Sequence, residues 1–270
     1  MSTTPHTDRS FDELIREAEE ADVSGWDFSW FEGRATELRP SWGYQRLLAG
    51  RLAEARAALD LQTGGGEVLA GALEIALAGR RPGRAAGPAL SAATEAYPPN
   101  VAKATALLHP MGTTVVAAPD DPPFPFADGA FDLVTSRHPV KAHFAEIARV
   151  LSPGGTYFAQ HVGPASVFEL VEYFLGPQPA EVRRARHPDD EAAEAKAAGL
   201  EVVDLRLERL RMEFHDIGAV VHFLRKVVWM VPGFTVEAYL PQLRALDEQI
   251  RSQGSFVAHS SRFLIEARKS

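Results

Sequence analysis

Cysteine is absent from this sequence of 270 residues. The chain therefore has no disulfide framework, no thiolate zinc site and no cysteine nucleophile. Long hydrophobic runs are missing too, because residues 220–234, the best candidate, are interrupted by charged residues and a proline. A membrane helix needs about 18 consecutive apolar residues, and the polar start of the chain lacks the apolar stretch of a signal peptide. We therefore expect a cytoplasmic protein with no membrane partner.

An excess of basic charge is also missing. The formal net charge is −8 and the isoelectric point is about 5.6, whereas nucleic-acid binding usually depends on a strongly basic surface. We therefore expect no nucleic-acid partner. Hydrophobic residues make up 46% and charged residues 24% of the chain, as in ordinary globular proteins. The length fits one large domain, or a domain with a lid.

Short apolar runs alternate with helix-compatible segments from residue 57 onward. This alternation is typical of an α/β protein. We predict a doubly wound, mostly parallel sheet of seven strands with a Rossmann-like fold. The expected strands are residues 57–61, 89–94, 113–117, 131–135, 156–162, 200–212 and 256–267. The expected helices include residues 41–56, 67–78, 98–108 and 140–151.

Two segments lie outside this alternation. Residues 1–40 form an N-terminal tail and an aromatic segment. We expect a helix to begin at Phe11, because Ser10 and Glu13 have the spacing of a capping box. Residues 213–251 carry two amphipathic helices between the last two strands, and we expect them to form a cap over the carboxyl ends of the strands. The core is then residues 41–212 and 252–270. The alternative for the cap is a dimerisation surface, so a homodimer stays open.

Three of the four tryptophans lie between positions 26 and 42. They indicate either a hydrophobic latch that packs the N-terminal segment onto the main domain or an aromatic wall of a substrate pocket. Both roles use the large apolar area and single hydrogen-bond donor of tryptophan. The substrate-binding candidates are Trp26, Trp30, Trp42, Tyr44 and, in the expected cap, Trp229.

A strand, a glycine-rich turn and a helix follow one another in Asp60-Leu61-Gln62-Thr63-Gly64-Gly65-Gly66 and the residues after it. Glycines let the backbone approach a ligand closely, and such a turn could hold a dinucleotide. No Lys-Ser or Lys-Thr pair follows, so a phosphate-binding P-loop is disfavoured. Asp60 carries the wrong charge to bind phosphate, and it favours a ligand with an ammonium or sulfonium group.

Three further segments complete a pattern over residues 55–162. They are Ala93-Thr94-Glu95, then Asp120 followed by Phe124-Pro125-Phe126-Ala127-Asp128-Gly129-Ala130-Phe131-Asp132-Leu133-Val134, and finally Glu146-Ile147-Ala148-Arg149-Val150-Leu151-Ser152-Pro153-Gly154-Gly155. With these segments the sequence resembles the class I S-adenosylmethionine-dependent methyltransferases of the type 11-like group. The resemblance departs from the family at Gln62, which stands where the family usually has its first glycine.

The resemblance implies S-adenosylmethionine as cofactor, S-adenosylhomocysteine as product and a set of binding positions. These are Asp60, Gln62, Thr63, Gly64, Gly65, Gly66, Glu95, Asp120, Phe124, Phe126 and Ser136. The glycine backbone would approach the methionine end, and Asp60 would face its ammonium group. Glu95 would accept from the ribose hydroxyls and Asp120 from the adenine amino group. The two phenylalanines would pack against adenine or belong to the core.

Histidines are the candidates for a general base because they titrate near neutral pH. His138 and His161 lie at the ends of the fourth and fifth expected strands, and His222 lies in the expected cap. Each could instead be a structural residue. No His-x-x-His or glutamate-rich ligand set is present, so we expect no bound metal.

The leading interpretation is methyl transfer to a small-molecule acceptor by in-line attack on the sulfonium methyl, with proximity and desolvation as the main catalytic effects. One alternative is an RNA or protein methyltransferase. The other is a non-catalytic S-adenosylmethionine-binding protein, which stays open because Gln62 replaces the usual first glycine. An NAD-dependent dehydrogenase is disfavoured by the residues that follow Asp60 and by the segment from Phe131 to Val134.

Overall fold

The computed structural model describes residues 9–25, 28–79 and 87–270. The chain divides into two compact units. The helical unit, as we call the first, consists of Met1–Arg39, Ala165–Ala185 and Arg209–Ser261. The sheet unit consists of Pro40–Pro164, Arg186–Glu208 and Arg262–Ser270. The three-part division expected from the sequence, with a cap over the strand ends, stays a prediction.

The described residues form one sheet of eight strands in the order β1-β7-β8-β6-β5-β2-β3-β4. The strands are β1 (Ala35–Glu37), β2 (Ala57–Leu61), β3 (Leu90–Glu95), β4 (Thr113–Ala117), β5 (Phe131–Arg137), β6 (Leu151–Val162), β7 (Leu200–Phe214) and β8 (Phe256–Lys269). Strands β4, β3, β2, β5 and β6 are parallel to one another, whereas β8 is antiparallel to β6. The Rossmann-like, mostly parallel sheet is therefore confirmed.

The prediction of seven strands is wrong because of β1. Its three residues pair antiparallel with the end of β7, with Ala35 opposite Phe214 and Glu37 opposite Met212. A strand of three residues is too short to show the alternation of apolar and polar residues by which strands are recognised in a sequence.

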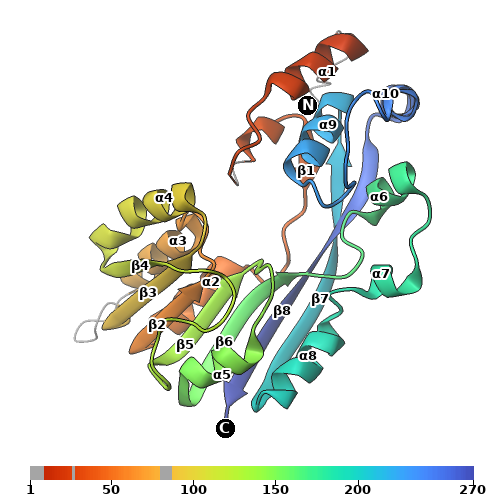
Figure 1. Ribbon diagram of the computed structural model, residues 1–270. Helices are drawn as coiled ribbons and strands as arrows, with labels where there is room; N and C mark the ends of the chain where they lie inside the picture. The colour runs from red at the N-terminus through yellow and green to blue at the C-terminus, as the bar shows by residue number, and fades with distance from the viewer. Residues whose placement is uncertain (1–8, 26–27, 80–86) are drawn as a thin grey trace. The chain divides into compact units, whose positions relative to one another are not determined.

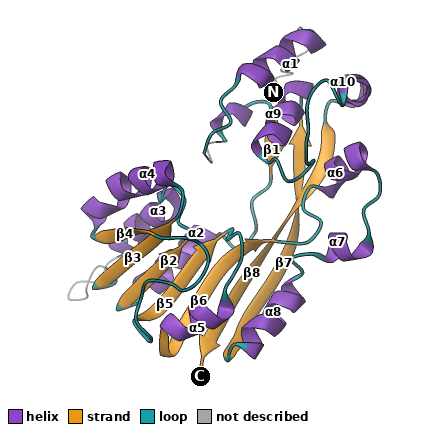
Figure 2. Cartoon of the chain, in the orientation of Figure 1, coloured by secondary structure: helices purple, strands orange, loops and turns teal. Residues whose placement is uncertain are grey.

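Helices connect these strands (Figures 1 and 2). The helices are α1 (Phe11–Glu20), α2 (Tyr44–Leu52), α3 (Glu67–Ala78), α4 (Pro98–Leu108), α5 (Phe144–Val150), α6 (Phe168–Leu175), α7 (Ala180–Arg184), α8 (Pro188–Ala197), α9 (Ile217–Lys226) and α10 (Leu240–Gln253), with short 3-10 turns η1 (Ser29–Phe31) and η2 (His109–Met111). Helix α9 ends at Lys226, although apolar residues recur at helical spacing from Ile217 to Val231, an apolar stripe that predicts a helix as far as Val231. The predicted capping box at the start of α1 is confirmed, since Ser10 and Glu13 bond reciprocally.

Both faces of the sheet unit are covered, as a parallel sheet requires. Successive side chains of a strand point to opposite faces, so Ala58 packs with helices α2, α3 and α4, while Leu59 packs with α5 and α8. Leu133 and Val134 of β5 divide in the same way. Two apolar layers therefore hold the strands whose carboxyl ends form the candidate site.

The helical unit has its own core. Leu14 of α1, Val220 of α9 and Leu246 of α10 are at most 1% exposed and belong to one apolar cluster. The same cluster takes in Phe214 at the end of β7 and Ala258 near the start of β8. The apolar stripe of α9 that the sequence shows is therefore buried within this unit.

Asp132 fixes the start of β2 against β5. Its carboxylate accepts hydrogen bonds from the backbone N–H groups of Arg56, at 3.0 Å, and Ala57, at 2.9 Å. We expect Asp132→Ala to lower the free energy of unfolding by about 1–3 kcal/mol because two backbone donors lose a charged acceptor. Asp132→Asn keeps one acceptor oxygen and should lose less. Urea unfolding measures both, and equal, negligible effects of the two substitutions would contradict this role.

Candidate functional site

The carboxyl ends of four parallel strands of the sheet unit meet at one edge. Strand β2 lies between β3 and β5, so the chain leaves β2 toward one side of the sheet and returns on the other. In open α/β sheets the crevice at such a switch point is where ligands bind. Asp60, Glu95, Asp120 and Ser136 all lie at or just beyond these strand ends. The fold thus gathers cofactor residues predicted from four separate segments.

The glycine turn has the backbone that the sequence predicts. Gly66 has φ +85° and caps α3, and a Cβ there would lie 2.9 Å from the Leu108 side chain, so only glycine fits without strain. Gln62 also adopts a left-handed conformation, with φ +55°. A non-glycine residue therefore takes the conformation that favours glycine, and the departure from the family pattern leaves the turn intact.

Glu95 ties the turn to the end of β3. Its Oε2 accepts from the backbone N–H of Gly64 at 2.8 Å, and its Oε1 accepts from that of Tyr97 at 2.9 Å. The backbone N–H of Thr63 donates to the carbonyl of Thr94 in the same region. Each carboxylate oxygen can accept more than one hydrogen bond, so Glu95 keeps capacity for a ligand.

Asp60 is buried at the end of β2. Its Oδ1 accepts from the Thr135 hydroxyl at 2.6 Å. Burial raises the pKa of Asp60 to about 6, and the hydrogen bond from Thr135 opposes that rise. A buried carboxylate whose pKa is raised in this way gains from a cationic ligand nearby.

Asp120 and the two phenylalanines have different surroundings. Burial, Glu95 and Asp121 together raise the pKa of Asp120, which indicates that negative charge gathers at this edge. Phe124 is buried, and Phe126 packs edge-on against Phe131 at 5.1 Å between ring centroids. Both phenylalanines belong to the apolar cluster under α5 and α8, the core role that the sequence left open.

The side chain of Gln62 bridges to the loop after β5. Its Oε1 accepts from the backbone N–H of Val140 at 2.7 Å, and its Nε2 donates to the carbonyl of Lys141 at 3.4 Å. The Ser136 hydroxyl donates to the carbonyl of Leu61 at 2.9 Å. The glycine turn is therefore fastened to β5 and its following loop.

Trp42 and Tyr44 lie inside the sheet unit. The Trp42 indole N–H donates to Oε1 of Gln160 at 2.9 Å, and Nε2 of Gln160 lies 2.9 Å from Nε2 of His138. The Tyr44 hydroxyl donates to the carbonyl of Ser136 at 3.0 Å. Two predicted aromatic residues thus approach two predicted site residues, and Gln160, which the sequence analysis missed, connects one pair.

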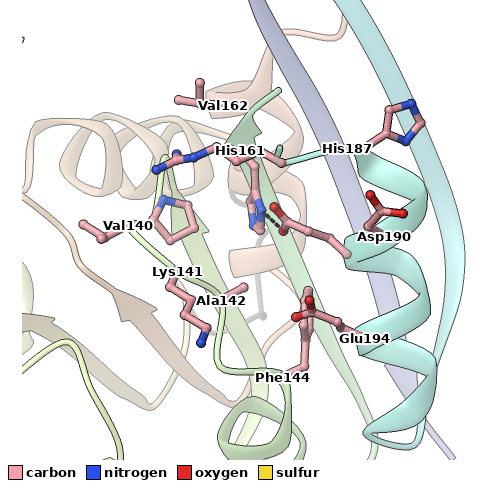
Figure 3. Close-up of a pocket in the computed structure, with 12 residues that line it drawn as sticks. Val140, Lys141, Ala142, Phe144, His161, Val162, His187, Asp190 and Glu194 are labelled. Carbon is pink, nitrogen blue, oxygen red and sulfur yellow. Dashed lines mark hydrogen bonds and ion pairs between the residues drawn. The ribbon is translucent and has the colours of Figure 1, made fainter. Parts of the chain in front are cut away.

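His161 belongs to a buried chain of three side chains. Its Nδ1 lies 2.6 Å from Glu191 and its Nε2 lies 2.9 Å from the Tyr157 hydroxyl. Burial raises the pKa of Tyr157 well above its usual value. His161 also borders a pocket of about 190 Å³. Figure 3 shows this pocket, with the Glu194 side chain extending from α8 toward the loop that follows β5.

The remaining described candidates, Trp30, His222 and Trp229, belong to the helical unit. Trp30 stacks on His222 at 4.3 Å between ring centroids, and His222 is fully buried, with no hydrogen-bond partner among the described residues for either ring nitrogen. Trp229 follows the end of α9 and is 56% exposed, so it does not share the buried face of His222. Trp26 lies outside the described residues. The functional roles predicted for these residues stay predictions.

Two further properties concern residues 9–25, 28–79 and 87–270. Among them, no group of three or more histidine, aspartate or glutamate side chains is placed to hold a metal ion. None of the helices in this part of the chain has the length and apolar character to cross a bilayer.

Comparison with known proteins agrees with this geometry. Residues 59–159 match the family model of a methyltransferase domain, whereas no curated protein matches the chain. Solved structures of similar fold include a functionally unknown protein from Deinococcus radiodurans R1, with a TM-score of 0.58 and 14% identity over 96% of this chain and 99% of that one. A candidate methyltransferase from Bacillus halodurans C-125 has a TM-score of 0.54 and 17% identity over 83% of this chain and 98% of that one. The YcgJ protein from Bacillus subtilis has a TM-score of 0.54 and 17% identity over 84% and 97%.

At these identities the solved structures show the fold alone. The family match agrees with the resemblance inferred from the sequence, because residues 59–159 match a methyltransferase domain. The domain match spans β2 through most of β6 and includes the glycine turn and Glu95.

Proposed function

We propose that this protein transfers a methyl group from S-adenosylmethionine to a small-molecule acceptor. The observation that carries the proposal is the hydrogen bond from the Gly64 backbone to Glu95. It holds a glycine turn and an acidic side chain together at the switch point of the sheet. The backbone of the glycine turn can approach a ligand closely, and the Glu95 carboxylate can accept hydrogen bonds from hydroxyl groups of that ligand.

The charge of the site supports this cofactor. Asp60, Glu95 and Asp120 place carboxylates at one edge, and burial together with repulsion from Glu95 and Asp121 raises the pKa of Asp120. A pyrophosphate would add to this repulsion, whereas an ammonium and a sulfonium group relieve it. Glu95 would hold the ribose hydroxyls, and Asp120 the adenine amino group. When bound, S-adenosylmethionine supplies a methyl group on positive sulfur that a nucleophile in line with the C–S bond can take.

A small acceptor is supported by the pocket and by the charge of the chain. The pocket beside His161 holds about 190 Å³, and Gln62 bonds to two of the residues that line it, Val140 and Lys141. A net charge of −8 disfavours an RNA acceptor. Holding acceptor and methyl donor together can contribute about 7–11 kcal/mol to lowering the barrier, so positioning is the main task of these residues.

Gln62 is the reason to consider a non-catalytic binding protein. Its backbone conformation, with φ +55°, is one that glycine adopts freely. The turn thus keeps a shape suited to close approach of a ligand, so Gln62 gives no reason to prefer the non-catalytic alternative.

Calorimetric titration distinguishes the proposed cofactor from a dinucleotide. We expect S-adenosylhomocysteine to bind in one-to-one ratio with micromolar affinity or better, and NAD to give no heat of binding. Turnover is then tested by release of S-adenosylhomocysteine across a set of small hydroxyl, amine and carbon acceptors. Binding of NAD with no response to S-adenosylhomocysteine would refute the cofactor assignment, and binding without turnover for any acceptor class would favour the non-catalytic alternative.

A further inference from the structure

His138 is held by Gln160 at two points. The backbone N–H of His138 donates to the carbonyl of Gln160 at 2.7 Å, and the two side chains meet through their Nε2 atoms at 2.9 Å. His138 stands directly after β5 with φ +58°, a left-handed backbone conformation that is strained for residues other than glycine. Such a conformation persists where neighbouring groups impose it, and here Gln160 does so.

Trp42 determines which way the Gln160 amide points. An indole N–H can only donate, so the Gln160 atom 2.9 Å from it is the carbonyl Oε1. The other end of the amide is the NH₂ group, which donates to Nε2 of His138. An imidazole nitrogen that accepts a hydrogen bond carries no proton, and the proton of the neutral ring therefore sits on Nδ1. The Trp42 indole thus orients the Gln160 amide, and the Gln160 amide fixes a single tautomer of His138.

The surroundings keep this imidazole neutral. Burial is the main cause that lowers the pKa of His138 well below its usual value, and Arg137, Arg262, His161 and Arg186 add to it. Among the described residues, no other group bonds to the His138 side chain, so its Nδ1–H is left for a ligand.

We infer that His138 binds the methyl acceptor as a neutral hydrogen-bond donor through Nδ1–H rather than acting as a general base, and that Gln160 and Trp42 are positioning residues that fix its tautomer. The substrate role rests on the proposed function. It implies an acceptor molecule with a lone pair near the reacting atom, such as a carboxylate, carbonyl or phenolic oxygen. The neutral Nδ1–H group of His138 orients such an oxygen through a hydrogen bond, and no proton is transferred to or from the acceptor molecule.

The tautomer can be read directly by ¹H–¹⁵N correlation NMR of the protein labelled at histidine, without cofactor or acceptor. His138→Asn identifies the His138 signals by their loss. Between pH 6 and 8 we expect Nδ1 of His138 to show the shift of a protonated nitrogen and Nε2 that of an unprotonated one, in a population ratio of at least ten to one.

Two substitutions test the positioning residues. Gln160→Glu replaces the NH₂ donor by a carboxylate oxygen, so the proton should move to Nε2 and the His138 pKa should rise by at least one unit. Trp42→Phe removes the indole N–H and frees the amide to rotate, so the two tautomers should become mixed although Trp42 does not touch His138. His109→Gln, on an exposed residue, is the control that should leave the His138 signals unchanged.

An Nε2-protonated ring in the unmodified protein would overturn the inference, as would unchanged signals in a folded Gln160→Glu or Trp42→Phe variant. These signals do not depend on cofactor binding. A protein that keeps the predicted tautomer but does not bind S-adenosylhomocysteine refutes the proposed function and the substrate role of His138, while the roles of Gln160 and Trp42 in fixing the tautomer stand.

Discussion

Glu95→Ala is expected to weaken binding of S-adenosylhomocysteine at least tenfold. The substitution removes the proposed acceptor for the ribose hydroxyls, and hydrogen bonds to charged groups contribute about 1.5–3 kcal/mol. It also releases the Gly64 and Tyr97 backbone N–H groups, so the glycine turn loses its fixed position. Both effects act against the cofactor, and isothermal titration measures their sum.

Glu95→Gln and Asp121→Ala are the matched controls. The glutamine keeps the length of the side chain and one acceptor oxygen but loses the charge, so its affinity should lie between those of the unmodified protein and Glu95→Ala. Asp121 is an exposed acid near the same edge, and its removal should change affinity less than threefold. Unchanged binding in a folded Glu95→Ala variant would remove Glu95 from the cofactor site.

His222→Phe is expected to stabilise the protein at pH 7 by about 1–3 kcal/mol. His222 is fully buried, and neither ring nitrogen has a hydrogen-bond partner in residues 9–25, 28–79 and 87–270, a cost that an apolar ring avoids. Its ring stacks on Trp30 and meets Phe31 edge-on at 5.0 Å between centroids, contacts that a phenylalanine ring can keep. The free energy of unfolding in urea measures the gain.

The same substitution should remove part of the acid sensitivity. Burial is the largest cause that lowers the pKa of His222 to about 4 from 6.5. Between pH 4 and pH 6.5 the unfolded chain binds more protons at His222 than the folded protein does. The free energy of unfolding is therefore not reduced by this group above pH 6.5, and it decreases as the pH falls toward 4. The loss amounts to about 3 kcal/mol at most. His109→Phe, on an exposed histidine, should keep this pH dependence.

If His222→Phe destabilises the protein or keeps the same loss between pH 6.5 and 4, the packing role of His222 is wrong. If the variant is stable but loses methyl transfer, the sequence-based prediction of a catalytic His222 gains support. The stability of the variant and its methyl transfer are measured separately, so the two results can be told apart.

The core of the sheet unit could be predicted from the sequence because its elements are bounded by strong local signals. Helices α3 and α4 begin after glycine and at proline, and strand β4 is a β-branched run, so the predicted bounds of these elements agree with the structure. Helix α5 is shorter than predicted. It begins at Phe144, since the residues after Pro139 form the loop that Gln62 fastens, and this tertiary contact has no local sequence signal.

The side-chain network of the site could be predicted only in part. Acidic residues at strand ends are visible in the sequence, and Asp60, Glu95 and Asp120 lie where they were expected. Gln160 is different, because it is an ordinary strand residue whose partner Trp42 is 118 positions away. Glu191 pairs with His161 from a helix rich in acids. Such pairings follow from the fold and leave no periodic pattern.

A crystal structure with S-adenosylhomocysteine bound tests the central claim most directly. We expect the ribose hydroxyls on the Glu95 carboxylate, the adenine amino group on Asp120, and the methionine end along the backbone of Gly64 to Gly66. The product bound elsewhere, or with its ribose away from Glu95, would contradict the account.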